Sequence, residues 1–336
     1  MNSPERQLEE RHRLLAIREH LKIHARPESP DFRTEVASAC LKQVRPIIDA
    51  HAHERGEAIM AAISSKLGVH FEEVRNPGDI SRLERKYLKE QKEIGFGLLS
   101  DALADEGVDA LLFQKTNVPV RNPHQWVAVL NLQETESRAY WSRPHEIVHR
   151  LAEPPQKRLP FYRHRSENEN TVERLVDFAA AELAFPASVF KPLVVSRSKE
   201  PLTWELVSEL RQKFAPTASV HSIAKACVNF WPTPVFFLTA SVRGRRSRPR
   251  DAVALRAKLE GNNAPARKSG IVFYDNMRVP PSSPIAWSLE SGDASVDVED
   301  LGKWVTSSGD RLPSRTALTS AMRMRDQVYG LISPAP

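Results

Sequence analysis

The chain has 336 residues, which is long enough for a sizeable core and, from length alone, indicates about two domains. Its 41% hydrophobic and 27% charged residues are typical of a soluble globular protein, and no apolar run approaches the roughly 20 residues that a membrane span needs. A net charge of +6 spread over this length is too small to indicate by itself a nucleic-acid partner.

The N-terminus and the cysteines indicate the compartment. The first residues, M-N-S-P-E-R-Q-L-E-E-R-H-R, are too charged for a signal peptide. Cys40 and Cys227 each lie in an apolar stretch and do not imply a disulfide framework. We therefore expect a protein of the reducing cytoplasm with no membrane partner.

The first half of the chain changes from helical to strand-like patterns. The first 106 residues show apolar residues at helical spacing, and Gly68 follows one such pattern as a predicted helix end. Two short segments with partial alternation of apolar residues then predict strands, at 108–114 and 126–132.

The rest of the chain mixes both patterns. Helices are predicted at 142–152, 171–184, 203–214 and 217–228. Strands are predicted at 234–241, 270–274 and 284–290, and a terminal helix at about 315–332. The stretch 241–269 is rich in arginine and small residues with little apolar periodicity, so we interpret it as a linker.

The segment 142–151 reads S-R-P-H-E-I-V-H-R-L and contains an H-E-x-x-H motif. On a helix, His145 and His149 lie on one face, one turn apart, and this spacing lets two imidazole nitrogens reach one zinc ion. Glu146 projects beside them, where it can take a proton from an attacking water without binding the metal. Ser142 is the predicted N-cap of this helix, and Pro144 falls in its first turn. The motif alone is equally compatible with two ordinary helix histidines, so its context decides.

The helix predicted at 171–184 offers the remaining ligand of a zinc peptidase site, which needs three protein ligands and one open position. With Thr171 as the cap of this helix, Glu173 and Asp177 lie on one face. Glu173 is the predicted third ligand, and Glu169, one turn earlier, is the alternative. Asp177 is predicted to accept the outer N–H of a ligating histidine and so to fix the orientation of its ring.

These two helices resemble the ImmA/IrrE family of metallopeptidases, which has a gluzincin-type layout. The family has an aromatic residue and a Ser or Thr before H-E-x-x-H, matched by Trp141 and Ser142. It then has E-x-x-x-(N/D) running into an alanine-rich helix that ends in a hydrophobic residue and proline. The matching residues are Glu173, Asp177, Ala179 to Ala181, Leu183, Phe185 and Pro186. The resemblance covers roughly residues 55–230, with an aspartate at 177 where asparagine is common, and Ala184-Phe185 in place of Leu-Leu or Leu-Met.

The resemblance and the element pattern together predict an α+β fold in three parts. A helical N-terminal region covers 1–75, and a minimal zincin-like metallopeptidase domain with a small sheet covers 76–232. A helical segment at the end of this domain leads to a strand-containing C-terminal α/β module at 233–336, which includes the arginine-rich linker 241–269.

The resemblance implies a cytoplasmic zinc-dependent endopeptidase, with Mn²⁺ as an alternative metal in vitro. His145, His149 and Glu173 would bind the metal, and Glu146 would act as the general base. Members of this family typically make a limited cut in a helix-turn-helix repressor encoded beside them, which relieves repression. We expect the strand at 126–132 to pair with such a substrate as an edge strand.

The alternative is a non-enzymatic regulator that binds the repressor or DNA. The run S-V-R-G-R-R-S-R-P-R at 241–250 motivates it, because arginine binds phosphate well. The run lacks interleaved aromatic residues for base stacking, so a solvated loop is the favoured interpretation and direct nucleic-acid binding the less favoured one. An intact Glu146 also favours the enzyme, because a purely structural zinc site does not need a glutamate there.

Overall fold

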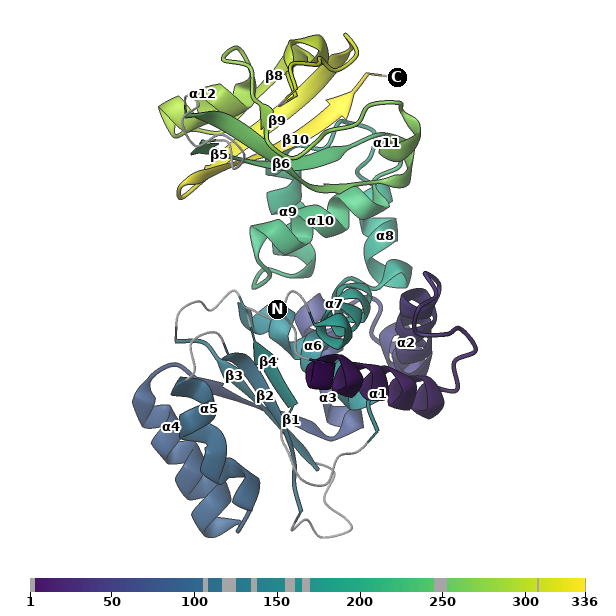
Figure 1. Ribbon diagram of the computed structural model, residues 1–336, viewed down its shortest axis with the longest axis vertical. Coiled ribbons are helices and arrows are strands. Elements are labelled where there is room, and N and C mark those ends of the chain that lie inside the picture. The colour runs from purple at the N-terminus through teal and green to yellow at the C-terminus, as the bar shows by residue number, and fades with distance from the viewer. Residues whose placement is uncertain are drawn as a thin grey trace. The chain divides into compact units, whose positions relative to one another are not determined.

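A computed structural model of the chain describes residues 4–104, 108–116, 125–133, 138–154, 161–164, 170–244, 253–306 and 308–335. These residues form two compact units, and their helices and two sheets confirm the mixed α+β class (Figure 1). Unit 1 comprises Met1–Val189 with Thr217–Ser219, and unit 2 comprises Phe190–Pro216 with Val220–Pro336. The predicted boundaries after residues 75 and 232 differ from this division.

Unit 1 is built on a four-stranded sheet with helices on both faces (Figure 1). Its strands are β1 (Val69–Val74), β2 (Val108–Gln114), β3 (Trp126–Asn131) and β4 (Phe161–His164). Its helices are α1 (Pro4–Leu21), α2 (Phe32–Ala50), α3 (Gly56–Leu67), α4 (Pro77–Glu84), α5 (Leu99–Ala104), α6 (Arg138–Ala152) and α7 (Thr171–Ala184). A π-helical segment, η1 (Arg85–Glu90), and a 3₁₀ segment, η2 (Ile94–Leu98), lie between α4 and α5.

The order of this sheet places β3 in its interior. The strands run β1-β3-β2-β4, with β1 parallel to β3 and the other neighbours antiparallel. Because β3 is hydrogen-bonded on both sides, it has no free edge, and the prediction that the strand at 126–132 pairs with a substrate is wrong. Almost all residues of β2 and β3 are buried, since helices cover both faces of the sheet, and this explains why their apolar residues alternate only in part.

The N-terminal region belongs to unit 1 and does not form the separate part predicted at 1–75. Its strand β1, which the helical interpretation of residues 1–106 missed, forms one edge of the sheet, and α2 packs against α7. Pairing with β3 stabilises β1, and the local sequence does not show that pairing. Gly68 ends α3 with a left-handed φ of 67°, as predicted.

Unit 2 is built on a six-stranded sheet in which every neighbour is antiparallel, in the order β7-β6-β5-β10-β9-β8. The strands are β5 (Phe236–Arg243), β6 (Ala254–Asn262), β7 (Met277–Arg278), β8 (Ser295–Asp300), β9 (Thr316–Met324) and β10 (Gln327–Pro334). The helices are α9 (Trp204–Phe214), α10 (Val220–Phe230), α11 (Ala264–Lys268), α12 (Pro284–Ser291) and the 3₁₀ segment η3 (Leu301–Lys303). Helix α8 (Ala187–Val195) spans the division between the units.

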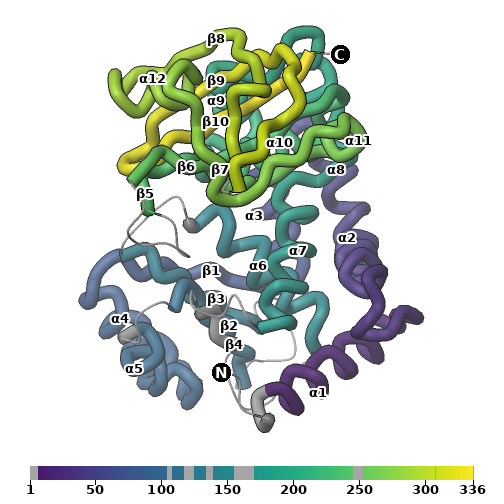
Figure 2. Tube along the Cα trace, turned by 45° about the horizontal axis from the view of Figure 1, so that its top comes forward, coloured from purple at the N-terminus to yellow at the C-terminus, as the bar shows by residue number. Residues whose placement is uncertain are grey.

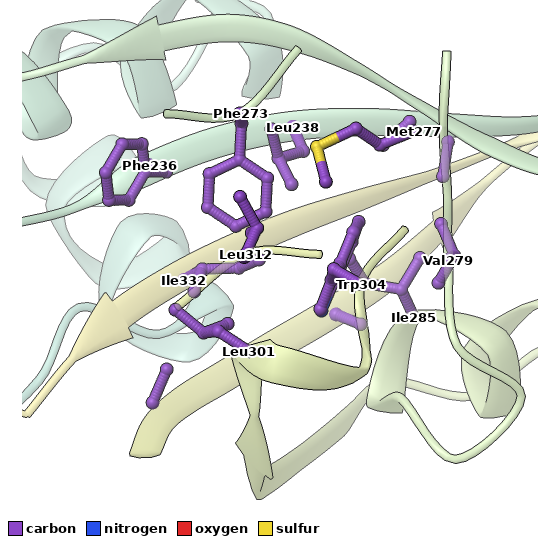
Figure 3. Packing of buried hydrophobic residues seen from close by; sticks show 14 of the residues in the cluster. Phe236, Leu238, Phe273, Met277, Val279, Ile285, Leu301, Trp304, Leu312 and Ile332 are labelled. Carbon is purple, nitrogen blue, oxygen red and sulfur yellow. The ribbon is translucent and has the colours of Figure 1, made fainter. Parts of the chain in front are cut away.

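Buried side chains pack against both faces of this sheet. On one face, Phe236 and Ile332 pack with Phe273 and Trp304, whose ring centroids are 5.2 Å apart (Figure 3). On the other face, Trp204 of α9 donates its indole N–H to the backbone of β9 and β10, at 3.0 Å in each case. The helices α9 and α10 therefore belong with the C-terminal sheet, not with the domain predicted at 76–232.

Several predictions for the C-terminal part are wrong. The predicted linker 241–269 contains the end of β5, all of β6 and α11, although 245–252 lie outside the described residues. The stretch 270–274 lies outside any strand, and 284–290 lies in α12, which Ser283 caps and Pro284 begins. The predicted terminal helix 315–332 is the hairpin of β9 and β10. Its Ala, Leu and Met residues favour helix locally, but pairing across the sheet decides the outcome.

Gly330 of β10 lies where α12 packs on the sheet. A Cβ atom at this position would lie 2.5 Å from Ile285 Cδ1. We expect Gly330→Ala to lower the free energy of unfolding of unit 2 by about 1–3 kcal/mol, because the side chain of Ile285 must move within a packed core. Urea denaturation would measure this, with Gly261→Ala as the control, since a Cβ on Gly261 has no neighbour within 4 Å. Equal losses in both variants would contradict the prediction.

The short segment Thr217–Ser219 belongs to unit 1, between two segments of unit 2. The backbone N–H and the hydroxyl of Thr217 both donate to Glu57 Oε1, at 3.1 and 2.7 Å. The chain therefore passes between the units three times.

No single helix of the described ranges has both the length and the apolar character for crossing a membrane, and only the bent pair α7 and α8 passes that test together. Cys40 and Cys227 are free and buried. Burial raises the pKa of both thiols, which keeps them protonated at neutral pH.

Candidate metal centre

Helices α6 and α7 lie side by side in unit 1 (Figure 2). The buried Ala179 and Ala180 let the helices approach closely, and the hydroxyl of Tyr140 on α6 donates to the carbonyl oxygen of Ala184 on α7 at 2.8 Å. This packing brings four of the predicted site residues together: His145, His149, Glu173 and Asp177.

Three buried side chains converge on one point. His145 Nε2 and His149 Nε2 are 3.0 Å apart, and Glu173 Oε2 lies 3.2 and 3.4 Å from them. Ligand atoms about 2.0–2.1 Å from a tetrahedral zinc ion lie about 3.3–3.4 Å from one another, so these separations fit an ion between the three atoms. His145, His149 and Glu173 therefore form a buried group that could hold a metal ion.

The outer nitrogens of both histidines face carboxylates. His145 Nδ1 is 2.9 Å from Asp177 Oδ1, and His149 Nδ1 is 2.6 Å from Glu153 Oε1. An ionised carboxylate only accepts hydrogen bonds, so each Nδ1 donates to its carboxylate and each Nε2 is the ring nitrogen that faces the centre. Glu173 is buried, and its Oε2 atom faces both Nε2 atoms. Two imidazole nitrogens and a carboxylate oxygen this close together and buried favour a cation among them, either a proton or a metal ion.

The charges of the centre reinforce one another. Burial alone would lower the pKa of His149, but the carboxylates of Glu173 and Glu153 raise it to about 10. Burial alone would raise the pKa of Glu173, but His149 and His145 hold it well below its usual value. The group therefore holds positive charge strongly, as a proton or as a metal ion.

Helix α6 carries the predicted general base but begins earlier than predicted. Glu146 lies on α6 between the two histidines and is buried. Ser142 is buried inside α6 and is not its N-cap, and Pro144 is an interior residue, because the helix already includes Arg138. A proline there removes the N–H that would bond to the carbonyl of Tyr140.

The start of α7 also differs from the prediction. Its cap is Asn170, not Thr171, and the Asn170 side chain accepts from the N–H groups of Val172 and Glu173 at 2.9 and 3.3 Å. Asn170 therefore fixes the backbone of Glu173 directly. The alternative ligand Glu169 lies outside the described residues, as do the arginines of the 245–252 stretch.

Two residues that the sequence analysis missed complete the centre. Glu153 is 3% exposed and follows α6, four residues after His149. That spacing is the one at which helix side chains meet, so the sequence contained a signal for it. Arg13 of α1 donates to both oxygens of Glu153, and no local pattern relates residues that far apart.

We expect metal binding to displace a proton, because His149 is protonated below its pKa of about 10 and must be neutral to bind metal. Below that pKa, the apparent zinc affinity should rise with pH, by about tenfold per pH unit for one displaced proton. Zinc titrations between about pH 7 and about pH 9 would measure this, and calorimetry in two buffers would count the protons released. A constant affinity over this range would contradict the prediction.

Comparisons with known proteins add little. No family model matches the chain, and no curated protein matches it. Among solved structures, the chain is similar to one described as "Mycobacterium tuberculosis transcriptional regulator", with 8% sequence identity and a TM-score of 0.43. The match covers 96% of this chain and 82% of that chain. A likeness at this level supports no inference about function.

Proposed function

We propose that the protein is a zinc-dependent endopeptidase of the ImmA/IrrE type. The observation that carries the proposal is the buried group of His145, His149 and Glu173, with Glu146 on the same helix as both histidines. Two imidazoles and one carboxylate are a donor set that suits zinc, and Mn²⁺ is an alternative in vitro. When bound, the ion would supply a Lewis acid that polarises a peptide carbonyl and makes water more acidic.

The number of ligands favours catalysis over a structural role. Structural zinc sites use four protein ligands, whereas catalytic sites use three and keep one position open. Within the described residues, the group has three members, His145, His149 and Glu173. This count supports an open position for a substrate or a water.

Three further carboxylates near this group would then have roles in the reaction. Glu146 would take a proton from the attacking water and pass it to the leaving amine. Asp177 and Glu153 would hold the outer N–H groups of the two histidines, which keeps both Nε2 lone pairs directed at the centre.

We further propose that the substrate is a partner protein and that the cut is limited. The resemblance of 138–186 to the ImmA/IrrE family supports a helix-turn-helix repressor encoded beside the gene, whose cleavage would relieve repression. General digestion would be harmful inside a cytoplasm, which also favours one partner.

The test uses the purified full-length protein loaded with Zn²⁺ or Mn²⁺ and the neighbouring helix-turn-helix repressor. We expect one discrete cut, which a chelator prevents and added zinc restores. A protein that holds zinc but leaves the repressor intact would contradict the proposed substrate. Extensive digestion of an unfolded protein such as casein would contradict the limited cut.

A further inference from the structure

Arg13 of α1 reaches the candidate metal centre from a position 140 residues before Glu153 in the sequence. Its Nη2 atom donates to Glu153 Oε1 at 2.9 Å and to Oε2 at 3.2 Å, and its Nε donates to Oε2 at 3.3 Å. The Glu153 side chain is 1% exposed, whereas that of Arg13 is 24% exposed. A carboxylate this deeply buried needs a cationic partner, and the fork of an arginine matches both of its oxygens.

The same guanidinium also lies beside the proposed carboxylate ligand. Arg13 Nη2 is 3.8 Å from Glu173 Oε1, while the other oxygen, Oε2, faces the two histidines. One side chain therefore contacts two carboxylates of the centre. The first, Glu153, lies 2.6 Å from the outer nitrogen of His149, and the second, Glu173, belongs to the group that could hold a metal ion.

We propose that Arg13 is a positioning residue of the metal centre. It fixes Glu153 against His149 Nδ1 and holds Glu173 with Oε2 directed at the two Nε2 atoms. Helix α1 thus contributes a residue to the metal centre, as α6 and α7 do. This inference rests on the metal-binding part of the proposed function, and it does not depend on which protein is cleaved.

A second contact supports this placement of α1. The backbone N–H of Thr171, at the start of α7, donates to Glu10 Oε2 at 3.3 Å. Glu10 and Arg13 are three residues apart and lie on one face of α1, so this face meets both the start of α7 and the end of α6. Figure 1 shows α1 on the same side of unit 1 as these two helices.

The test measures zinc affinity by competition with a chromophoric chelator, and the visible absorption of bound Co²⁺ reports the ligand geometry. We expect Arg13→Ala and Glu153→Gln each to weaken zinc binding by about 10–100-fold and to alter the Co²⁺ spectrum. Arg13→Lys should recover part of the loss, because lysine keeps the charge but not the two-pronged contact. The double variant Arg13→Ala with Glu153→Gln should lose less than the product of the two single losses, since both act through His149.

The matched control is Arg11→Ala, an exposed arginine on the same helix. It should leave the zinc affinity and the Co²⁺ spectrum unchanged. Thermal unfolding of the metal-free variants distinguishes positioning of the ligands from simple anchoring of α1. If Arg13 only anchored α1, Arg13→Ala would lower the stability and leave the zinc affinity unchanged. That result would overturn the inference. Failure of the wild-type protein to bind zinc would instead overturn the proposed function.

Discussion

Replacing Glu146 with glutamine is expected to slow peptide cleavage by about 10²–10⁴-fold in kcat and to leave the bound metal unchanged. Glutamine has nearly the shape of glutamate but cannot take a proton from water, and Glu146 is not among the three residues whose ligand atoms converge. Cleavage of the repressor, followed over time by gel electrophoresis, gives the rate. Elemental analysis after dialysis gives the metal content.

The control for this variant is Glu205→Gln, which alters an exposed glutamate at the start of α9 in unit 2. It should cleave at the wild-type rate. Equal rates for wild type and Glu146→Gln would remove the peptidase proposal. The non-enzymatic regulator would be favoured instead if Glu146→Gln kept full regulation of the target genes. Replacement of Arg245, Arg246 and Arg248 would then have to abolish that regulation.

Loss of the metal is the expected result of His145→Ala. This change removes one of three ligand atoms from a buried centre, so the fall in zinc affinity should exceed the roughly 10–100-fold that loss of an outer hydrogen-bond partner causes. Zinc titration against a competing chelator would measure it. Retention of a full equivalent of tightly bound zinc would exclude the proposed ligand set.

The matched control is Asp177→Ala, which removes the acceptor of the His145 Nδ1 proton but leaves every ligand atom in place. Its loss of zinc affinity should be the smaller one, about tenfold, because the Asp177 side chain is 45% exposed and water can replace it. Circular dichroism of both metal-free variants would show that the fold is intact. A larger loss of zinc affinity in Asp177→Ala than in His145→Ala would contradict the roles of His145 as a ligand and of Asp177 as its hydrogen-bond partner.

The residues of the centre were predictable where they follow a helical repeat. His145 and His149 are four residues apart, as are Glu173 and Asp177, and the bounds of α7 agree with the predicted helix at 171–184. The helix starts were less predictable, because capping depends on which polar side chain meets the free N–H groups. Asn170 does this in α7, where the sequence favoured Thr171.

Contacts between distant segments were not predictable from the sequence. The interior position of β3 depends on β1, whose pairing partner lies more than fifty residues further along the chain. The hairpin of β9 and β10 has helix-favouring residues, so only its place in the sheet explains it. Arg13 is the extreme case, since its contact with Glu153 joins α1 to the end of α6.

The return of Thr217–Ser219 to unit 1 bears on how the gene can be divided. A truncation after Val189 would keep α1, α6 and α7 but would remove Thr217, and with it two hydrogen bonds to Glu57 near the start of α3. No single cut therefore yields either unit whole. A designed fragment of unit 1 therefore needs a replacement for the two donors of Thr217, or a substitution of Glu57 that removes the need for them. Shortening the chain at one position provides neither change.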